Sequence, residues 1–156
     1  TAALLQVAHN YEQKGMSVVL IKPAIDTKAE DKVSSRLGIE RQVDILLAAT
    51  DRVIDRMKPV KPAAIIVDEA QFLTPAQVDE LYFLAKFYDV PVLCYGLRCD
   101  FRMEGFEGST RLLEIADDIE ENDDENDDEN ELFFFFFVSS SPHLPQNIVE
   151  SSIICV

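Results

Sequence analysis

The chain has 156 residues, which is enough for one domain with a real core but short for two. Its formal net charge is −15, but residues 1–116 hold 14 basic and 17 acidic side chains, so most of this charge lies after Ala116, where it would repel nucleic acid and anionic lipid. The sequence has three cysteines without a C-x-x-C pair, no secretory leader and no run of about 18 apolar residues. It therefore predicts a cytoplasmic protein with reduced thiols, and we expect neither a membrane nor nucleic acid as a partner.

The first three predicted elements are a helix, a strand and a second helix. Residues 2–13 have apolar side chains at helical spacing and end before Lys14-Gly15, which is typical of a helix terminus. Residues 17–23, SVVLIKP, form a β-branched run that a proline stops, as in a strand buried on both faces. Residues 45–57 return to a helical period, so we expect a helix there.

The next three elements repeat this alternation. Residues 63–68, AAIIVD, are a second apolar strand. Thr74-Pro75 fits an N-cap followed by proline at the first helical position, and the helix that it begins runs to about Tyr88. Residues 90–97, VPVLCYGL, are a third buried strand. Strands separated by helices of this length predict an α/β fold, with a parallel sheet and flanking helices.

The end of the chain differs in composition from the rest. Residues 121–131, ENDDENDDENE, are an acidic low-complexity repeat, and residues 132–138, LFFFFFV, are an aromatic run without a period. We place a domain boundary near Glu120, with the α/β domain over residues 1–120 and a disordered acidic and Phe-rich tail over residues 121–156. The alternative for the Phe run is a strand of the core.

Asp68 and Glu69, at the end of the second apolar strand, are the first candidates for chemistry. In parallel α/β sheets the carboxyl ends of the strands face the ligand crevice. An acid there can hold Mg²⁺, as in a Walker B strand, and the next acid can accept a proton from a hydroxyl. The alternative is a solvated pair that caps the following helix. Residues 34–36, Ser-Ser-Arg, leave a similar choice between a phosphate contact and a turn or helix cap.

Four segments resemble the tetrameric, zinc-containing thymidine kinases, in the same order and spacing. DEAQF (68–72) resembles the Walker B region of that family, and TAALLQVAHNYEQKGMSVVLIKPAIDTK (1–28) resembles its first helix and second strand. KVSSRLGI (32–39) is similar to the segment after its D-[TD]-[RK] turn, and VPVLCYGLRCDFRMEGFEGSTRLLEIAD (90–117) is similar to the strand and aromatic loop before its lasso domain. The resemblance implies a P-loop NTPase-like (RecA-like) nucleotide-binding domain up to about residue 120.

The resemblance also implies roles for single residues. Glu69 would be the general base that removes the proton from the 5′-hydroxyl of thymidine, and Asp68 would bind Mg²⁺. Thr1 aligns with the last residue of the phosphate loop, G-x-x-x-x-G-K-[ST], whose hydroxyl contacts the same ion. The residues implied at the ATP site are Thr1, Asp26, Thr27, Lys28, Asp68, Glu69, Ala70 and Gln71. The family commonly has arginine at the position of Lys28. The lysine keeps the positive charge, but it lacks the forked guanidinium that binds two phosphate oxygens at once.

Three aromatic residues are implied at the nucleoside. Phe101 and Phe106 resemble the aromatic pair around the thymine ring, and Phe72 would help to wall the pocket. The alternative for each ring is ordinary core packing, although Asp100 and Arg102 beside Phe101 favour a loop.

Both ends depart from the family's pattern. The phosphate-loop residues before Thr1 and the paired cysteines of the zinc domain after Glu120 do not occur, so we expect a fragment that does not bind zinc. The resemblance implies a homotetrameric enzyme of nucleotide salvage that uses ATP and Mg²⁺ to phosphorylate thymidine. The alternatives are a non-catalytic α/β remnant and an unrelated ATPase that shares only the Walker B strand. We expect the chain as written to be close to inactive.

Overall fold

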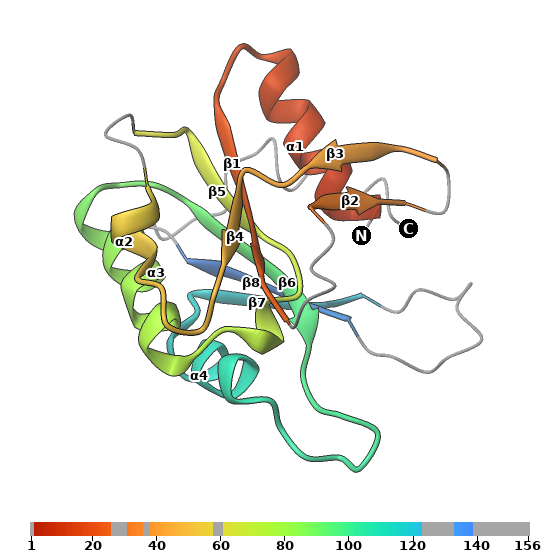
Figure 1. Ribbon diagram of the computed structural model, residues 1–156, viewed down its shortest axis with the longest axis vertical. Helices are drawn as coiled ribbons and strands as arrows, with labels where there is room; N and C mark the ends of the chain where they lie inside the picture. The colour runs from red at the N-terminus through yellow and green to blue at the C-terminus, as the bar shows by residue number, and fades with distance from the viewer. Residues whose placement is uncertain (1, 26–30, 36–37, 58–60, 123–132, 139–156) are drawn as a thin grey trace.

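The computed structural model describes residues 2–25, 31–35, 38–57, 61–122 and 133–138. Within them, a six-stranded sheet has the order β4-β1-β5-β6-β8-β7 (Figure 1). Its first four strands are parallel, and they are β4 (Ile45–Leu47), β1 (Val18–Pro23), β5 (Ala64–Val67) and β6 (Val92–Leu97). The predicted α/β class with a parallel sheet is therefore confirmed.

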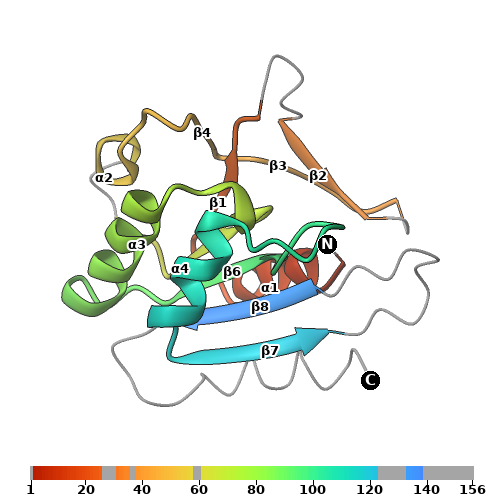
Figure 2. The same cartoon turned by 90° about the horizontal axis from the view of Figure 1, so that it is seen from below.

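Helices cover both faces of the parallel strands (Figure 2). The described helices are α1 (Ala2–Gln13), α2 (Val53–Arg56), the 3-10 helix η2 (Ala70–Phe72), α3 (Pro75–Phe87) and α4 (Glu107–Ile115). Leu4 of α1 packs in one apolar cluster with Ile66, whereas Leu81 of α3 and Leu112 of α4 pack in the other with Ile65. Because successive strand residues point to opposite faces, β5 is buried on both sides and has no polar position.

The N-terminus of α3 is capped as its sequence predicts. The Thr74 hydroxyl accepts the N–H of Gln77 at 3.2 Å, and Oε1 of Gln77 accepts the N–H of Thr74 at 3.0 Å, with Pro75 as the first helical residue. Nε2 of Gln77 also donates to the carbonyls of Ala48 and Asp51, at 2.8 and 3.0 Å. The capping box therefore fixes the loop after β4 as well as the helix.

The helix predicted over residues 45–57 is wrong in its first part. Ile45–Leu47 is strand β4, which pairs in parallel with β1 through Ile21 and Ile45. The chain then turns, and the Asp51 carboxylate accepts the N–H of Ala48 at 3.0 Å. Only Val53–Arg56 is helical. Periodicity does not distinguish a short apolar strand from a helical turn, and here the open edge of β1 decides for the strand.

A small antiparallel hairpin follows β1, with strands β2 (Lys32–Ser34) and β3 (Glu40–Gln42). Within its turn, the Ser35 hydroxyl accepts the N–H of Ile39 at 3.3 Å, and Gly38 has a φ of 79°. The structure therefore has a turn at Ser35, as one of the interpretations of residues 34–36 predicted, while Arg36 lies outside the described residues.

Two antiparallel strands extend the sheet beyond β6 (Figure 2). They are β7 (Asp118–Asn122) and β8 (Phe133–Val138). In place of the disordered tail expected over residues 121–156, residues 133–138 therefore form the strand that was given as the alternative, because they pair with the free edge of β6. The predicted boundary near Glu120 falls within β7, and residues 123–132 and 139–156 lie outside the described part.

Among the residues that the structure describes, no helix has the length and the apolar character needed to cross a membrane.

Candidate active site

The candidate site begins where β5 ends. The N–H of Asp68 donates to the carbonyl of Ile21 at 2.9 Å, so strand pairing continues as far as this residue. Glu69 then has φ 53° and ψ 41°, a left-handed conformation that a residue with a Cβ seldom adopts. This turn leads directly into η2 and leaves two adjacent carboxylates at the carboxyl edge of the sheet. Such strained residues cluster at ligand sites.

The carboxylate of Asp68 is buried, with only 7% of the residue exposed. Burial raises the pKa of Asp68 above its ordinary value, and the neighbouring charge of Glu69 raises it further, while Lys22 on β1 partly offsets both. An anion in this position is stabilised by an added cation.

The side chain of Gln71 is held at both ends. Its Nε2 donates to Oε2 of Glu69 at 2.5 Å, and its Oε1 accepts the N–H of Leu97 at 3.2 Å. Only 3% of Gln71 is exposed. The residue was expected on the nucleotide side of the site, and the structure turns its amide toward Glu69 and β6.

Gly96 makes room for this amide and was missed by the sequence interpretation. A Cβ at Gly96 would overlap Oε1 of Gln71 and would lie 3.0 Å from the Gln71 nitrogen and 3.1 Å from the Ala70 nitrogen. The available signal was a glycine inside an otherwise apolar strand, which often marks a close approach of another backbone.

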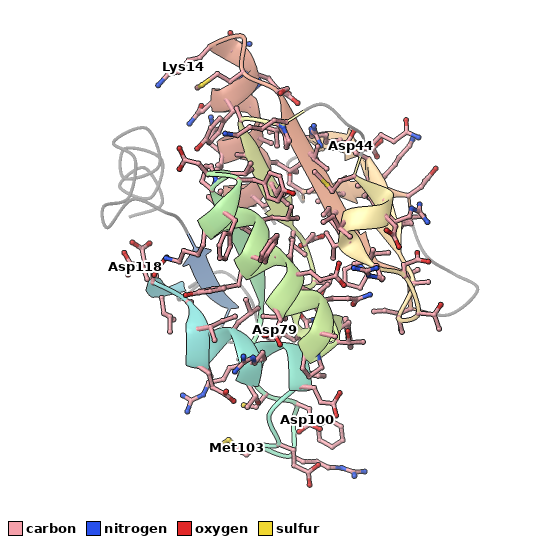
Figure 3. The ribbon with its side chains drawn as sticks, turned by 90° about the vertical axis from the view of Figure 1, so that its left-hand side faces the viewer. Lys14, Asp44, Asp79, Asp100, Met103 and Asp118 are labelled. Atoms are coloured by element: carbon pink, nitrogen blue, oxygen red, sulfur yellow. The ribbon has the colours of Figure 1, made fainter. Side chains whose placement is uncertain are left out.

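The loop from Arg98 to Phe106 projects from the end of β6. Figure 3 shows Asp100 and Met103 on this loop, beyond α4 and away from the sheet. The Asp100 carboxylate accepts the N–H groups of Arg102 and Glu104, at 2.8 and 3.1 Å, and Met103 has a φ of 64°. This tight turn leaves Phe101 90% exposed and Met103 86% exposed.

Two of the three predicted aromatic residues meet. The rings of Phe72 and Phe106 are 5.5 Å apart at an interplanar angle of 73°, an edge-to-face contact. Phe72 is 41% exposed, so core packing does not describe it. The ring of Phe101 lies under the guanidinium of Arg102, at 5.3 Å, and not against Phe106. The contact between Phe72 and Phe106 therefore joins the end of η2 to the start of α4.

Residues at the start of α4, also missed from the sequence, fix this arrangement. A Cβ at Gly108 would lie 2.6 Å from the Ala70 carbonyl and 2.7 Å from the Leu73 carbonyl, so only glycine allows α4 to approach η2 this closely. The Ser109 hydroxyl donates to the carbonyl of Leu97. The site is thus built from β5, η2, the end of β6 and α4.

The remaining predicted site residues are placed as follows. Ala70 is fully buried below the turn. Thr1, Asp26, Thr27 and Lys28 lie outside the described residues. Among the residues that are described, no group of three or more His, Cys, Asp or Glu side chains is arranged to hold a metal ion.

Comparison with known proteins gives a consistent result. The family model "Thymidine kinase" matches residues 1–123. A thymidine kinase of Streptococcus gordonii is 46% identical over 124 residues, which are 78% of this chain and 64% of the relative. A thymidine kinase of Enterobacteria phage T4 is 43% identical over 127 residues, covering 78% and 65% of the two chains, and one of Albidiferax ferrireducens is 46% identical over 122 residues, covering 76% and 60%. The chain thus spans less than two thirds of the length of these relatives.

Proposed function

Because the chain belongs to the thymidine kinase family, we propose that the protein transfers the γ-phosphoryl group of ATP to the 5′-hydroxyl of thymidine, a salvage reaction that gives thymidine monophosphate. The observation that carries the proposal is the Asp68-Glu69 pair at the carboxyl end of β5, with Glu69 held by Gln71. Phosphoryl transfer depends mostly on positioning and on charge stabilisation, and acids fixed at such an edge can contribute to both by holding a metal ion and by orienting the attacking hydroxyl.

Glu69 is the proposed general base. Its carboxylate accepts the proton of the 5′-hydroxyl as that oxygen attacks the γ-phosphorus, while the bond from the γ-phosphorus to the bridging oxygen of the β-phosphate breaks and ADP leaves. Glu69 is partly exposed, so a substrate can reach it, and the Gln71 amide limits where its oxygen atoms lie. Proton acceptance by a positioned side chain contributes about 10²–10⁴-fold to a rate.

Asp68 is the proposed magnesium ligand. The fit rests on its chemistry, because Mg²⁺ prefers oxygen ligands and takes one or two carboxylates together with water and phosphate oxygens. A buried carboxylate whose pKa is raised by burial and by Glu69 suits such an ion. When bound, Mg²⁺ neutralises charge on the phosphate oxygens. The further contacts to ATP that we propose are those of Thr1, Asp26, Thr27, Lys28 and Ala70. Gln71, which was expected at the same site, directs its amide to Glu69 and Leu97, so we propose that it holds Glu69 and does not contact ATP through its side chain.

The thymine ring is proposed to lie against the aromatic side chains of Phe72 and Phe106, which the T-shaped contact holds together. The exposed ring of Phe101, on the loop before Phe106, would close on the base. We also propose that the protein is a homotetramer and that it is cytoplasmic. The free thiols of Cys94 and Cys99 support the second proposal, because cytosolic proteins keep their thiols reduced.

The test is a thymidine kinase assay on the full natural polypeptide, with Mg²⁺ and ATP and with thymidine monophosphate measured by chromatography. Glu69→Gln should lower kcat by about 10²–10⁴-fold while ATP binding is retained. The matched control is Glu114→Gln, which removes a surface carboxylate paired with Arg111 and should leave kcat unchanged. Near-normal turnover by Glu69→Gln would remove this residue from the base role, and absence of thymidine monophosphate with the unaltered protein would refute the proposed function.

A further inference from the structure

We infer that Gln71 is a positioning residue, which fixes the carboxylate of Glu69 and links it to the segment that carries Phe106. The inference rests on the proposed function, in which Glu69 is the base. Its starting observation is a fully enclosed amide with both ends engaged, one by Glu69 and the other by the backbone of Leu97. Among the described residues, Gln71 is the side-chain donor to Glu69.

The orientation of this amide follows from its partners. The N–H of Leu97 can only donate, and an ionised carboxylate can only accept. Gln71 satisfies both when Oε1 faces Leu97 and Nε2 faces Glu69, and the flipped amide would satisfy neither. The contact at 2.5 Å to Glu69 is charge-assisted, the stronger class of hydrogen bond.

The surroundings leave the amide in one place. Gly96, next to Leu97, has no side chain, and the amide of Gln71 fills the space that a Cβ would take. Burial at 3% exposure removes the water that could substitute for either partner. The left-handed turn at Glu69 brings its side chain back toward residue 71, two positions later.

The hydrogen bonds continue beyond Gln71 to the aromatic side of the site. The backbone of Leu97 is also held at its carbonyl, to which the Ser109 hydroxyl donates. The next carbonyl, of Arg98, accepts the N–H of Phe106 at 3.3 Å. Phe106 then contacts Phe72, which ends η2. One network thus sets the distance between the proposed base and the ring pair proposed to hold the thymine.

Two substitutions separate the ends of the amide. Gln71→Glu keeps the size of the side chain and an acceptor for the Leu97 N–H, but replaces the donor to Glu69 by an oxygen that repels it. Gln71→Met removes both hydrogen bonds. The matched control is Gln77→Met, because Gln77 is the other buried glutamine of the described residues, and its amide serves Thr74, Ala48 and Asp51 away from Glu69.

We expect both Gln71 variants of the full natural polypeptide to lower kcat by about 100-fold, the size of loss that a misplacement of about 1 Å produces, with the KM for thymidine and for ATP changed by less than about threefold. Gln77→Met should lower the melting temperature and leave kcat unchanged. A Gln71→Glu variant with the kcat of the unaltered protein would overturn the inference, because the role of Gln71 would then be limited to holding Leu97.

A second measurement does not depend on activity or on the folding of the Gln71 variants. The side-chain amide protons of Gln71, assigned by their proximity to the Leu97 N–H in NMR spectra, should move upfield in Glu69→Ala. Unmoved signals would overturn the inference. If the unaltered protein does not phosphorylate thymidine, the proposed function fails and the positioning role fails with it, whereas an active protein with an active Gln71→Glu variant refutes Gln71 alone.

Discussion

The buried carboxylate of Asp68 opposes folding at neutral pH. Its pKa is raised in the folded state, first by burial and then by Glu69, so the folded state holds this proton more tightly than the unfolded chain does. The associated stability is fully present below the ordinary pKa of 3.8 and is lost as the pH rises through the folded value. A carboxylate that lowers the stability of the folded protein in this way is expected to serve a ligand.

Asp68→Asn should therefore raise the melting temperature at neutral pH by a few degrees, and the gain should shrink as the pH is lowered toward the ordinary pKa of aspartate. The same variant should lose most of the stabilisation that Mg²⁺ and ADP give to the unaltered protein. Thermal denaturation over a pH series measures both effects. Asp79→Asn, which removes an exposed partner of Arg111, is the control and should show no gain. A lower melting temperature for Asp68→Asn at neutral pH would contradict this account.

At the level of single residues, the sequence could predict where Asp68 and Glu69 lie but not what holds them. A buried strand followed by acids places those acids at the carboxyl edge of a parallel sheet. The partner of Gln71 is Leu97, 26 residues later in the chain, and no local pattern connects the two. Gly96 and Gly108 were visible as glycines, but their close contacts arise only after β6 and α4 have packed on η2.

Among the elements, α1 and α3 were predicted to within one residue of their observed ends, and for α3 the reason is that its start signal is local. Thr74, Pro75 and Gln77 lie within four consecutive positions and form the capping box without help from elsewhere. The region after β3 was predicted worst, because the turn at Ala48 and Asp51 is held by Gln77, which belongs to a later element. Where a tertiary contact fixes the backbone, periodicity alone misleads.

Thr74→Ala should lower the free energy of unfolding by about 1 kcal/mol, since it removes the acceptor for the Gln77 N–H at the start of α3. Urea denaturation followed by circular dichroism measures the change. Thr50→Ala, in the exposed loop after β4, deletes the same atoms without a capping role and should change the stability by less than about 0.5 kcal/mol. Equal losses in the two variants would argue against a specific contribution of the cap.

At the scale of the whole molecule, the described sheet has an apolar cluster on each face, and Cys94 lies inside one of them on the central strand β6. Burial raises the pKa of Cys94 to about 12, so little thiolate forms at any pH at which the protein is folded. Cys99 lies beyond the end of this strand and is partly exposed.

In a Cys155→Ser variant of the chain, a thiol reagent at about pH 8 should therefore modify Cys99 well before Cys94. Mass spectrometry of peptides identifies the site, and in concentrated denaturant both thiols should react at similar rates. Modification of Cys94 in the native protein should occur at the rate of global unfolding. Rapid native labelling of Cys94 would show that β6 is not enclosed as described.

The two antiparallel strands change what the protein offers to other chains. Because β8 pairs with β6, the described sheet ends at β4, which has three residues, and at β7, where Asp118, Glu120 and Glu121 are acidic. Short or charged outer strands are poor templates for intermolecular pairing, because few backbone groups are presented or like charges meet. The acidic strand β7 thus supplies a border that discourages aggregation, while the Phe-rich strand β8 is paired on both sides.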